Sequence, residues 1–240
     1  NTAVGANALG NGDSGGGNNT AVGYLAGYVL TGENNVIMGK SAGVAATSAD
    51  QNVIIGMQAV GTGVMTGDDN VVIGTNAAAD LTSGEFNVII GRHAAQQITD
   101  GVRNIIIGAL SGSQVDAQSG DDNVVIGYRA GYTLSTATEN VLIGNDAGKL
   151  LNNDHYNTFI GQSAGLNHQG GSQTFIGYNA GKGTQPHSSS SNNTAVGYDA
   201  LRNINGGQYN TIVGDMAGDA ITTGLYNTAI GRNSLGALTT

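Results

Sequence analysis

Apolar and polar residues follow one another along this chain in a pattern that returns about every 17 residues. Each repeat begins with Asn, continues with three residues rich in Thr, Val and Ile, and reaches Gly at its fifth position. That Gly occurs fourteen times, 16 to 20 residues apart, at residues 5, 23, 39, 56, 74, 91, 108, 127, 144, 161, 177, 197, 214 and 231. Fourteen tandem units therefore cover residues 1–240, and we expect a single repeat domain with no second domain.

Counted from its first residue, the anchor, each unit reads N-[T/V/I]-x-[I/V/M]-G-x-x-[A/S]. Positions 1 to 4 predict a short strand, because β-branched residues favour strands. The small residue at position 8, followed by Gly in eight units, fits either a second short strand or a close approach of backbones. A variable segment closes each of the first thirteen units. In nine of these units it carries Gly three residues before the next anchor, which is typical of turns.

Units of strand, turn, strand and turn that stack on one another form a parallel β-solenoid, so the predicted fold is all-β. Stacking places the anchor side chains above one another, where each amide can bond the next as a ladder. Gln173 is the anchor of one unit. The other anchors are Asn1, Asn19, Asn35, Asn52, Asn70, Asn87, Asn104, Asn123, Asn140, Asn157, Asn193, Asn210 and Asn227.

Strand alternation leads us to expect positions 2, 4 and 8 inside the coil and position 3 outside. Position 3 is nevertheless large and apolar in the central units. A strand that is apolar on both faces is buried on both faces, and a 17-residue coil has only one interior. We therefore expect an oligomer whose contact is made by position 3, at Ile54, Ile89, Ile106, Leu142, Phe159 and Phe175.

The units NTAVGYLAG, NTFIGQSAG, NTAVGYDAL and NTAIGRNSL resemble two related groups of repeats. One is the head repeat of trimeric autotransporter adhesins, a left-handed parallel β-roll of three chains. The other is the NTAIGYxAL-type repeat of phage tail-fibre and other fibrous surface proteins. The resemblance implies a left-handed β-roll, a homotrimer, and a structural fibre or filament module: the shaft or head of an appendage that is extracellular, on a cell surface or on a virion.

Composition narrows the class of protein further. Gly contributes 41 residues without a three-residue period and Pro only one, which excludes collagen, and the clustered β-branched residues are untypical of disorder. A net charge of −9 without any basic run makes nucleic acid and anionic membrane surfaces poor partners. No stretch reaches the roughly 20 apolar residues of a membrane span, so membrane insertion is not expected. The absence of Cys excludes disulfides and thiolate sites.

Candidates for chemistry are few, and we do not expect an enzyme. The four His residues lie in different units without the spacing of metal ligands, and we expect them in solvated loops: His93, His155, His168 and His187. Two Gly-Asp-Asp-Asn stretches offer weak calcium ligands, with ordinary polar turns as the alternative: Asp68, Asp69, Asp121 and Asp122. No cofactor other than this calcium is expected.

Tyrosines support an alternative function. Tyr24, Tyr128, Tyr178 and Tyr198 share position 6, and rings flanked by Asn and Asp can stack on sugars. The chain would then be an adhesin or receptor-binding module that recognises host or cell-surface glycans through its loops. In the other reading these rings cover turn edges and pack on neighbouring rings.

Neither end of the chain carries a recognisable cap. The first residues are already a unit in full register, and the last unit stops without a helix, a charge cluster or Pro. A bare terminal coil exposes unpaired strand edges. We therefore expect either a piece of a longer fibre or rods that join end to end into a filament.

Overall fold

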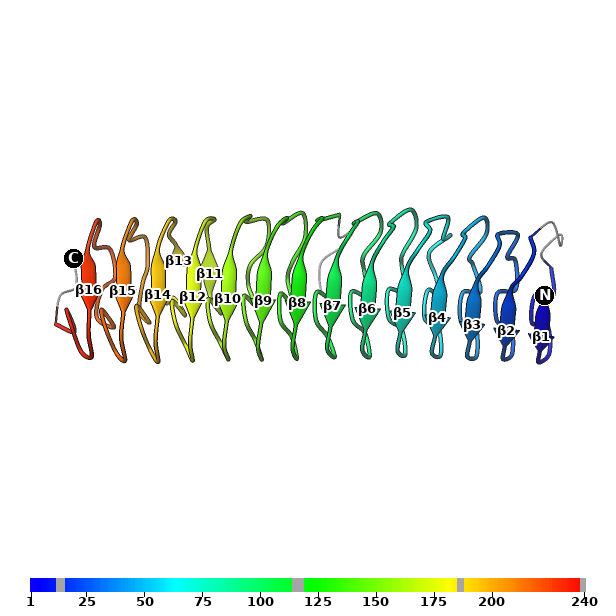
Figure 1. The fold of residues 1–240 in the computed structure, drawn as a ribbon, viewed down its shortest axis with the longest axis horizontal. Coiled ribbons are helices and arrows are strands. Elements are labelled where there is room, and N and C mark those ends of the chain that lie inside the picture. Colours follow the sequence, from blue (N-terminus) through cyan, green and yellow to red (C-terminus); the bar gives the residue numbers. More distant parts are fainter. Residues whose placement is uncertain (12–15, 114–118, 185–187, 238–240) are drawn as a thin grey trace. The chain divides into compact units, whose positions relative to one another are not determined.

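The computed structural model describes residues 1–11, 16–113, 119–184 and 188–237. Residues 1–122 and 123–240 form two compact parts, and each is described by itself. Each part contains seven short strands that lie parallel and in register, one for each sequence repeat (Figure 1). The described residues contain no helix that could span a membrane. The prediction of an all-β parallel β-solenoid is therefore confirmed, while handedness, the single domain and the trimer stay predictions.

The repeat strands occupy positions 2 to 4 of their units. In residues 1–122 they are β1 (Thr2–Val4), β2 (Thr20–Val22), β3 (Val36–Met38), β4 (Val53–Ile55), β5 (Val71–Ile73), β6 (Val88–Ile90) and β7 (Ile105–Ile107). In residues 123–240 they are β8 (Val124–Ile126), β9 (Val141–Ile143), β10 (Thr158–Ile160), β12 (Thr174–Ile176), β14 (Thr194–Val196), β15 (Thr211–Val213) and β16 (Thr228–Ile230). A second sheet pairs β11 (His168–Gln169) with β13 (Ser188–Ser189). Positions 8 and 9 form turns instead of a second strand.

The anchor side chains bond each layer, meaning one turn of the solenoid, to the next. The Oδ1 atom of Asn52 accepts the backbone N–H of Asn70 at 2.8 Å and the Nδ2 of Asn70 at 3.1 Å. The Nδ2 of Asn52 donates to the Oδ1 of Asn35 in the preceding layer at 3.2 Å, and to the carbonyl of Gly67, which leads to the following layer, at 3.1 Å. Because Asn52, Asn70 and Asn35 are all buried, these bonds satisfy polar groups that water cannot reach.

The Gly at position 5 is required by the short distance between layers. Gly74 has φ +141°, and a Cβ added there would lie 2.4 Å from the carbonyl oxygen of Gly91 in the next layer. No side chain fits at that distance, and L-residues rarely adopt that backbone conformation. The repeated Gly thus ends each strand and also allows successive layers to approach.

The assignment of inner and outer strand faces from the sequence is wrong for positions 2, 3 and 4. From β2 onward position 3 is buried inside the coil of its own chain, whereas positions 2 and 4 face outward and are half-buried or exposed. Position 8 is inward, as expected. The predicted oligomer contact at position 3 is therefore also wrong, because these side chains are at most 2% exposed in the single chain: Ile54, Ile89, Ile106, Leu142, Phe159 and Phe175.

The core shows why position 3 belongs inside. Residues at positions 3 and 9 share one space, and in several layers a large residue at one position meets a small one at the other. A Cβ on Gly165 would lie 2.5 Å from Phe159, whereas the layer with Ala195 at position 3 has Leu201 at position 9. A third inward column at position 12 completes the core with Leu30, Leu81, Ile98, Leu134, Leu151, His168, Ile204 and Ile221.

Removal of one ladder amide should destabilise the fold locally and strongly. In Asn52→Ala the buried N–H of Asn70 and the carbonyl of Gly67 both lose a partner, so we expect a loss of about 3 kcal/mol in the free energy of unfolding. Urea denaturation followed by circular dichroism measures this loss, and hydrogen exchange at the Asn70 amide shows where it occurs. The exposed Asn203→Ala removes one surface bond to the Asp219 carbonyl and should cost less than about 1 kcal/mol. Equal losses in the two variants would contradict a structural role for the ladder.

Candidate functional site

The outward faces of β3 to β7 carry only apolar side chains. Val36, Met38 and Ile105 are 36%, 40% and 39% exposed, and the others are half-buried. We call this surface the outward band; it consists of Val36, Met38, Val53, Ile55, Val71, Ile73, Val88, Ile90, Ile105 and Ile107. In residues 123–240, β8 and β9 continue the same pattern, whereas position 2 is Thr in every repeat strand from β10 onward.

Within residues 123–240, the position-6 tyrosines make different contacts. Tyr178 and Tyr198 lie on adjacent layers with ring centroids 5.2 Å apart and planes within 10°. Tyr128 instead stacks with the Arg129 guanidinium, whose Cζ lies 4.9 Å from the ring centroid. All four rings are exposed, but stacking covers one face of Tyr178 and one face of Tyr198, and ring faces are the surfaces that stack on sugars. Their geometry matches rings that pack on neighbouring rings, and glycan binding by them stays a prediction.

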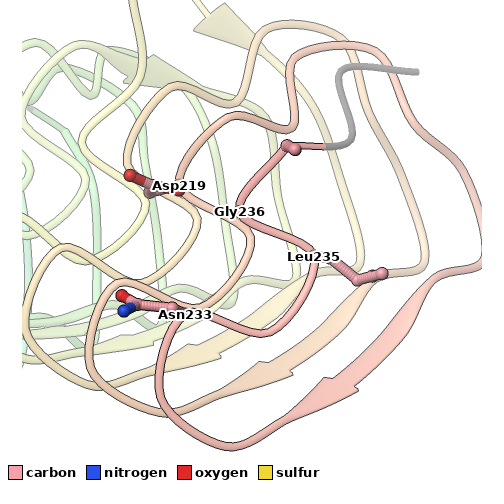
Figure 2. Close-up of a pocket in the computed structure, with 5 residues that line it drawn as sticks. Asp219, Asn233, Leu235 and Gly236 are labelled. Carbon is pink, nitrogen blue, oxygen red and sulfur yellow. The ribbon is translucent and has the colours of Figure 1, made fainter.

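One cavity lies beside the last described layer of residues 123–240. It has a volume of about 740 Å³ and is lined by Asp219, Asn233, Leu235, Gly236 and Ala237 (Figure 2). The lining offers one carboxylate and one side-chain amide. These are too few convergent polar groups to define a ligand.

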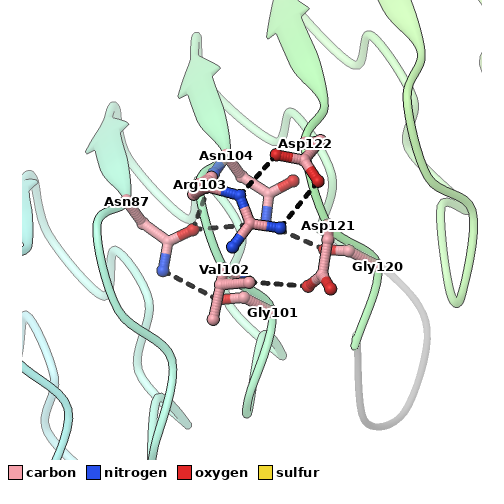
Figure 3. Close-up of polar contacts among 8 residues, drawn as sticks. All are labelled: Asn87, Gly101, Val102, Arg103, Asn104, Gly120, Asp121 and Asp122. Carbon is pink, nitrogen blue, oxygen red and sulfur yellow. Dashed lines mark hydrogen bonds and ion pairs between the residues drawn. The ribbon is translucent and has the colours of Figure 1, made fainter.

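The predicted calcium ligands bind groups of their own chain. The Asp68 carboxylate accepts the Asp50 N–H at 2.7 Å, and the Asp121 carboxylate accepts the Val102 N–H at 2.8 Å (Figure 3). The Asp122 carboxylate forms two hydrogen bonds with Arg103, at 2.6 and 2.8 Å, and these bonds hold its pKa below the ordinary value.

The two Asp pairs do not meet, because they lie three layers apart, or about 14 Å at the usual strand spacing. Among the described residues, no three His, Cys, Asp or Glu side chains lie close enough together to hold a metal ion.

The expectation of solvated histidines is wrong for His168. It occupies position 12, where the preceding layer has Leu151 and several other layers have Leu or Ile, and it is fully buried. His93 and His155 are half-buried, and the Nδ1 of His155 accepts the Thr138 N–H at 3.0 Å. His187 lies outside the described residues. The sequence signal for His168 was its position, eleven residues after the anchor, where the other layers place core residues.

His168 lies against two stacked aromatic rings. Phe159 and Phe175 are 5.1 Å apart and within 7° of parallel, and the His168 ring meets both edge-on. Its Nε2 donates to the Ser190 carbonyl at 3.1 Å, while its buried Nδ1 has no partner among the described residues. Burial lowers the pKa of His168 to about 4, although the bond to Ser190 acts in the opposite direction. The imidazole is therefore neutral at pH 7 and connects β11 to the segment that follows β13.

The layers around His168 are the irregular part of residues 123–240. The unit that starts at Asn157 has 16 residues and the next, from Gln173, has 20. A second cavity of about 350 Å³ lies here between three successive layers. We call it the polar cavity; it is lined by Asn152, Asn153, Asp154, Gln169, Gly170, Ser189 and Ser191.

Acid should weaken the fold through His168. Its pKa is about 4 in the folded chain and about 6.5 when unfolded, so the unfolded chain takes up the proton first as the pH falls. The stability from the neutral ring is fully present above pH 6.5 and is lost towards pH 4. Between pH 7 and 4.5 we expect the unfolding free energy of the native chain to fall about 2–3 kcal/mol more than that of His168→Leu. Urea titrations at both pH values measure this difference, and identical pH dependence of the two proteins would refute it.

Comparison with known proteins does not assign this chain to a family. No family model matches it, and no curated protein matches it in sequence. The resemblance of its repeat to fibre proteins therefore stays a prediction from the sequence. The function has to be inferred from the outward band, the tyrosines and the polar cavity.

Proposed function

We propose that this chain is a structural module of an extracellular or virion fibre, in which copies of the chain pack side by side through the outward band. Its role is mechanical rather than enzymatic. In the described part of the chain, the contacts between repeat strands join strands of adjacent repeats, so layers can be added without a change of fold. Such a construction suits a shaft that spaces or presents something at a distance.

The outward band is the observation that carries this proposal. Both outward positions of five successive strands are Val, Ile or Met, and the chain itself leaves them facing water. Soluble monomers rarely expose a contiguous apolar surface of this kind, and such surfaces usually mark protein interfaces. A flat row of β-branched side chains is complementary to another copy of itself. That three copies associate is inferred from the resemblance to trimeric fibres.

Glycan recognition is the second candidate function. The polar cavity favours it, since seven residues with polar atoms converge there from three layers. The tyrosines support it less, because two of the rings cover each other.

Charges on the outward band should separate the copies. One chain has a mass of 24.0 kDa, and we expect light scattering of the native protein to give the mass of an oligomer. The double variant Ile73→Lys/Ile90→Lys should be a folded monomer, because two ammonium groups cannot be buried unpaired between apolar faces. Circular dichroism should still show β structure in that monomer.

Two controls test the assignment of the faces. Thr66→Lys/Ser83→Lys adds the same charge at exposed loop positions in adjacent layers and should leave the oligomer intact. Ile89→Lys, one residue from Ile90 but inside the core, should unfold the chain. A native chain that is monomeric at high concentration would refute lateral packing through the band.

A further inference from the structure

The polar cavity lies where the anchor ladder loses a bond. In neighbouring layers the anchor Nδ2 donates to the carbonyl three residues before the next anchor, as from Asn140 to Asp154 at 3.0 Å. For Asn157 the equivalent carbonyl belongs to Gly170, a residue of the cavity wall. The Nδ2 of Asn157 is instead buried and has no partner among the described residues.

A second polar atom without a partner belongs to Asn152, a residue of the wall. The Oδ1 of Asn152 is buried and accepts no hydrogen bond within the described part of the chain. A buried polar atom left unpaired costs about 1–3 kcal/mol, so each such atom calls for an explanation. Both atoms are shut off from solvent, so they mark where the regular bonding between layers is broken, and a ligand would bind through the other polar groups of the lining.

The segment of residues 189–191, which contributes to the cavity wall, is bonded to the core. Ser190 lies between the lining residues Ser189 and Ser191, and its carbonyl accepts hydrogen bonds from His168 and from the Gln173 side chain. Pairing of β11 with β13 places Gln169 beside Ser189. Hence the backbone that carries the Ser189 and Ser191 hydroxyls and the Gln169 amide is held by the core.

The chemistry of the lining restricts the class of ligand. It contains no Lys, Arg or His, and Asp154 repels anions, so phosphate and sulfate esters do not fit. It contains no apolar side chain, which excludes lipids and aromatic ligands. A single carboxylate is too little charge for a dedicated calcium site. What remains is a neutral ligand with many hydroxyl groups.

We propose that the polar cavity binds one residue of a saccharide. Sugar hydroxyls both donate and accept, and they match the amides of Asn152, Asn153 and Gln169, the two serine hydroxyls and the Asp154 carboxylate. The volume of about 350 Å³ lies at the small end of ligand pockets, which suits a single sugar ring. This site is independent of self-association through the outward band.

Calorimetric titration of the full chain with D-glucose, D-galactose and N-acetyl-D-glucosamine tests the proposal. We expect saturable binding of at least one sugar with Kd of about 1 mM. Asp154→Ala and Gln169→Ala should each weaken that binding at least tenfold. Both variants keep the backbone carbonyls that accept bonds from Asn140 and Ser190, and circular dichroism checks that they fold.

Asp100→Ala and Ser83→Ala are the matched controls, since both residues are exposed and lie in residues 1–122. They should bind the sugar as the native chain does. The proposal would be overturned if the folded chain bound none of the three sugars, or if the cavity variants bound a sugar as tightly as the native chain does. It would also be overturned if titration with calcium chloride gave a binding signal and the sugars gave none. Light scattering of the same samples reports self-association separately, so the failure of one proposal does not imply the failure of the other.

Discussion

Hydrogen bonding by the anchor amides is the interaction on which the other features of each unit depend. One buried Asn side chain bonds both the preceding and the following layer, and it also accepts a backbone N–H that would otherwise be unpaired. These bonds hold the strands parallel and in register at the usual spacing of about 4.8 Å. At that spacing no side chain fits at position 5, so Gly there follows from the ladder.

Inside the coil, packing is adjusted from layer to layer. Positions 3, 9 and 12 enclose one small core, so a change of volume at one position is offset at another: Phe159 faces Gly165, whereas Ala195 accompanies Leu201. The aromatic layers also contain His168, which replaces an aliphatic residue and binds Ser190. A repeat protein can therefore vary its sequence considerably while keeping the same backbone.

Regular stacking by itself forms few cavities, because each layer repeats the surface of the one before it. Within residues 123–240, the polar cavity occurs where a unit of 16 residues is followed by one of 20. The loops there no longer align, a ladder bond is lost at Asn157, and a small second sheet forms. The regular strands thus carry an apolar outer face, and the irregular loops form a polar cavity.

The repeat of Asn, β-branched residues and Gly was sufficient to predict the strands, their parallel stacking and the bonds between anchor amides, because each is a local consequence of a 17-residue period. Which strand face lies inside could not be read from alternation, since Ile or Val occupies both faces in the central units. The volumes at positions 3 and 9 carried that information, but only in combination. The burial of His168, the interactions of Asp68, Asp121 and Asp122, and the polar cavity were decided by tertiary structure. Each depends on which residues of neighbouring layers meet, and that is set by the direction of the turns and the lengths of the loops.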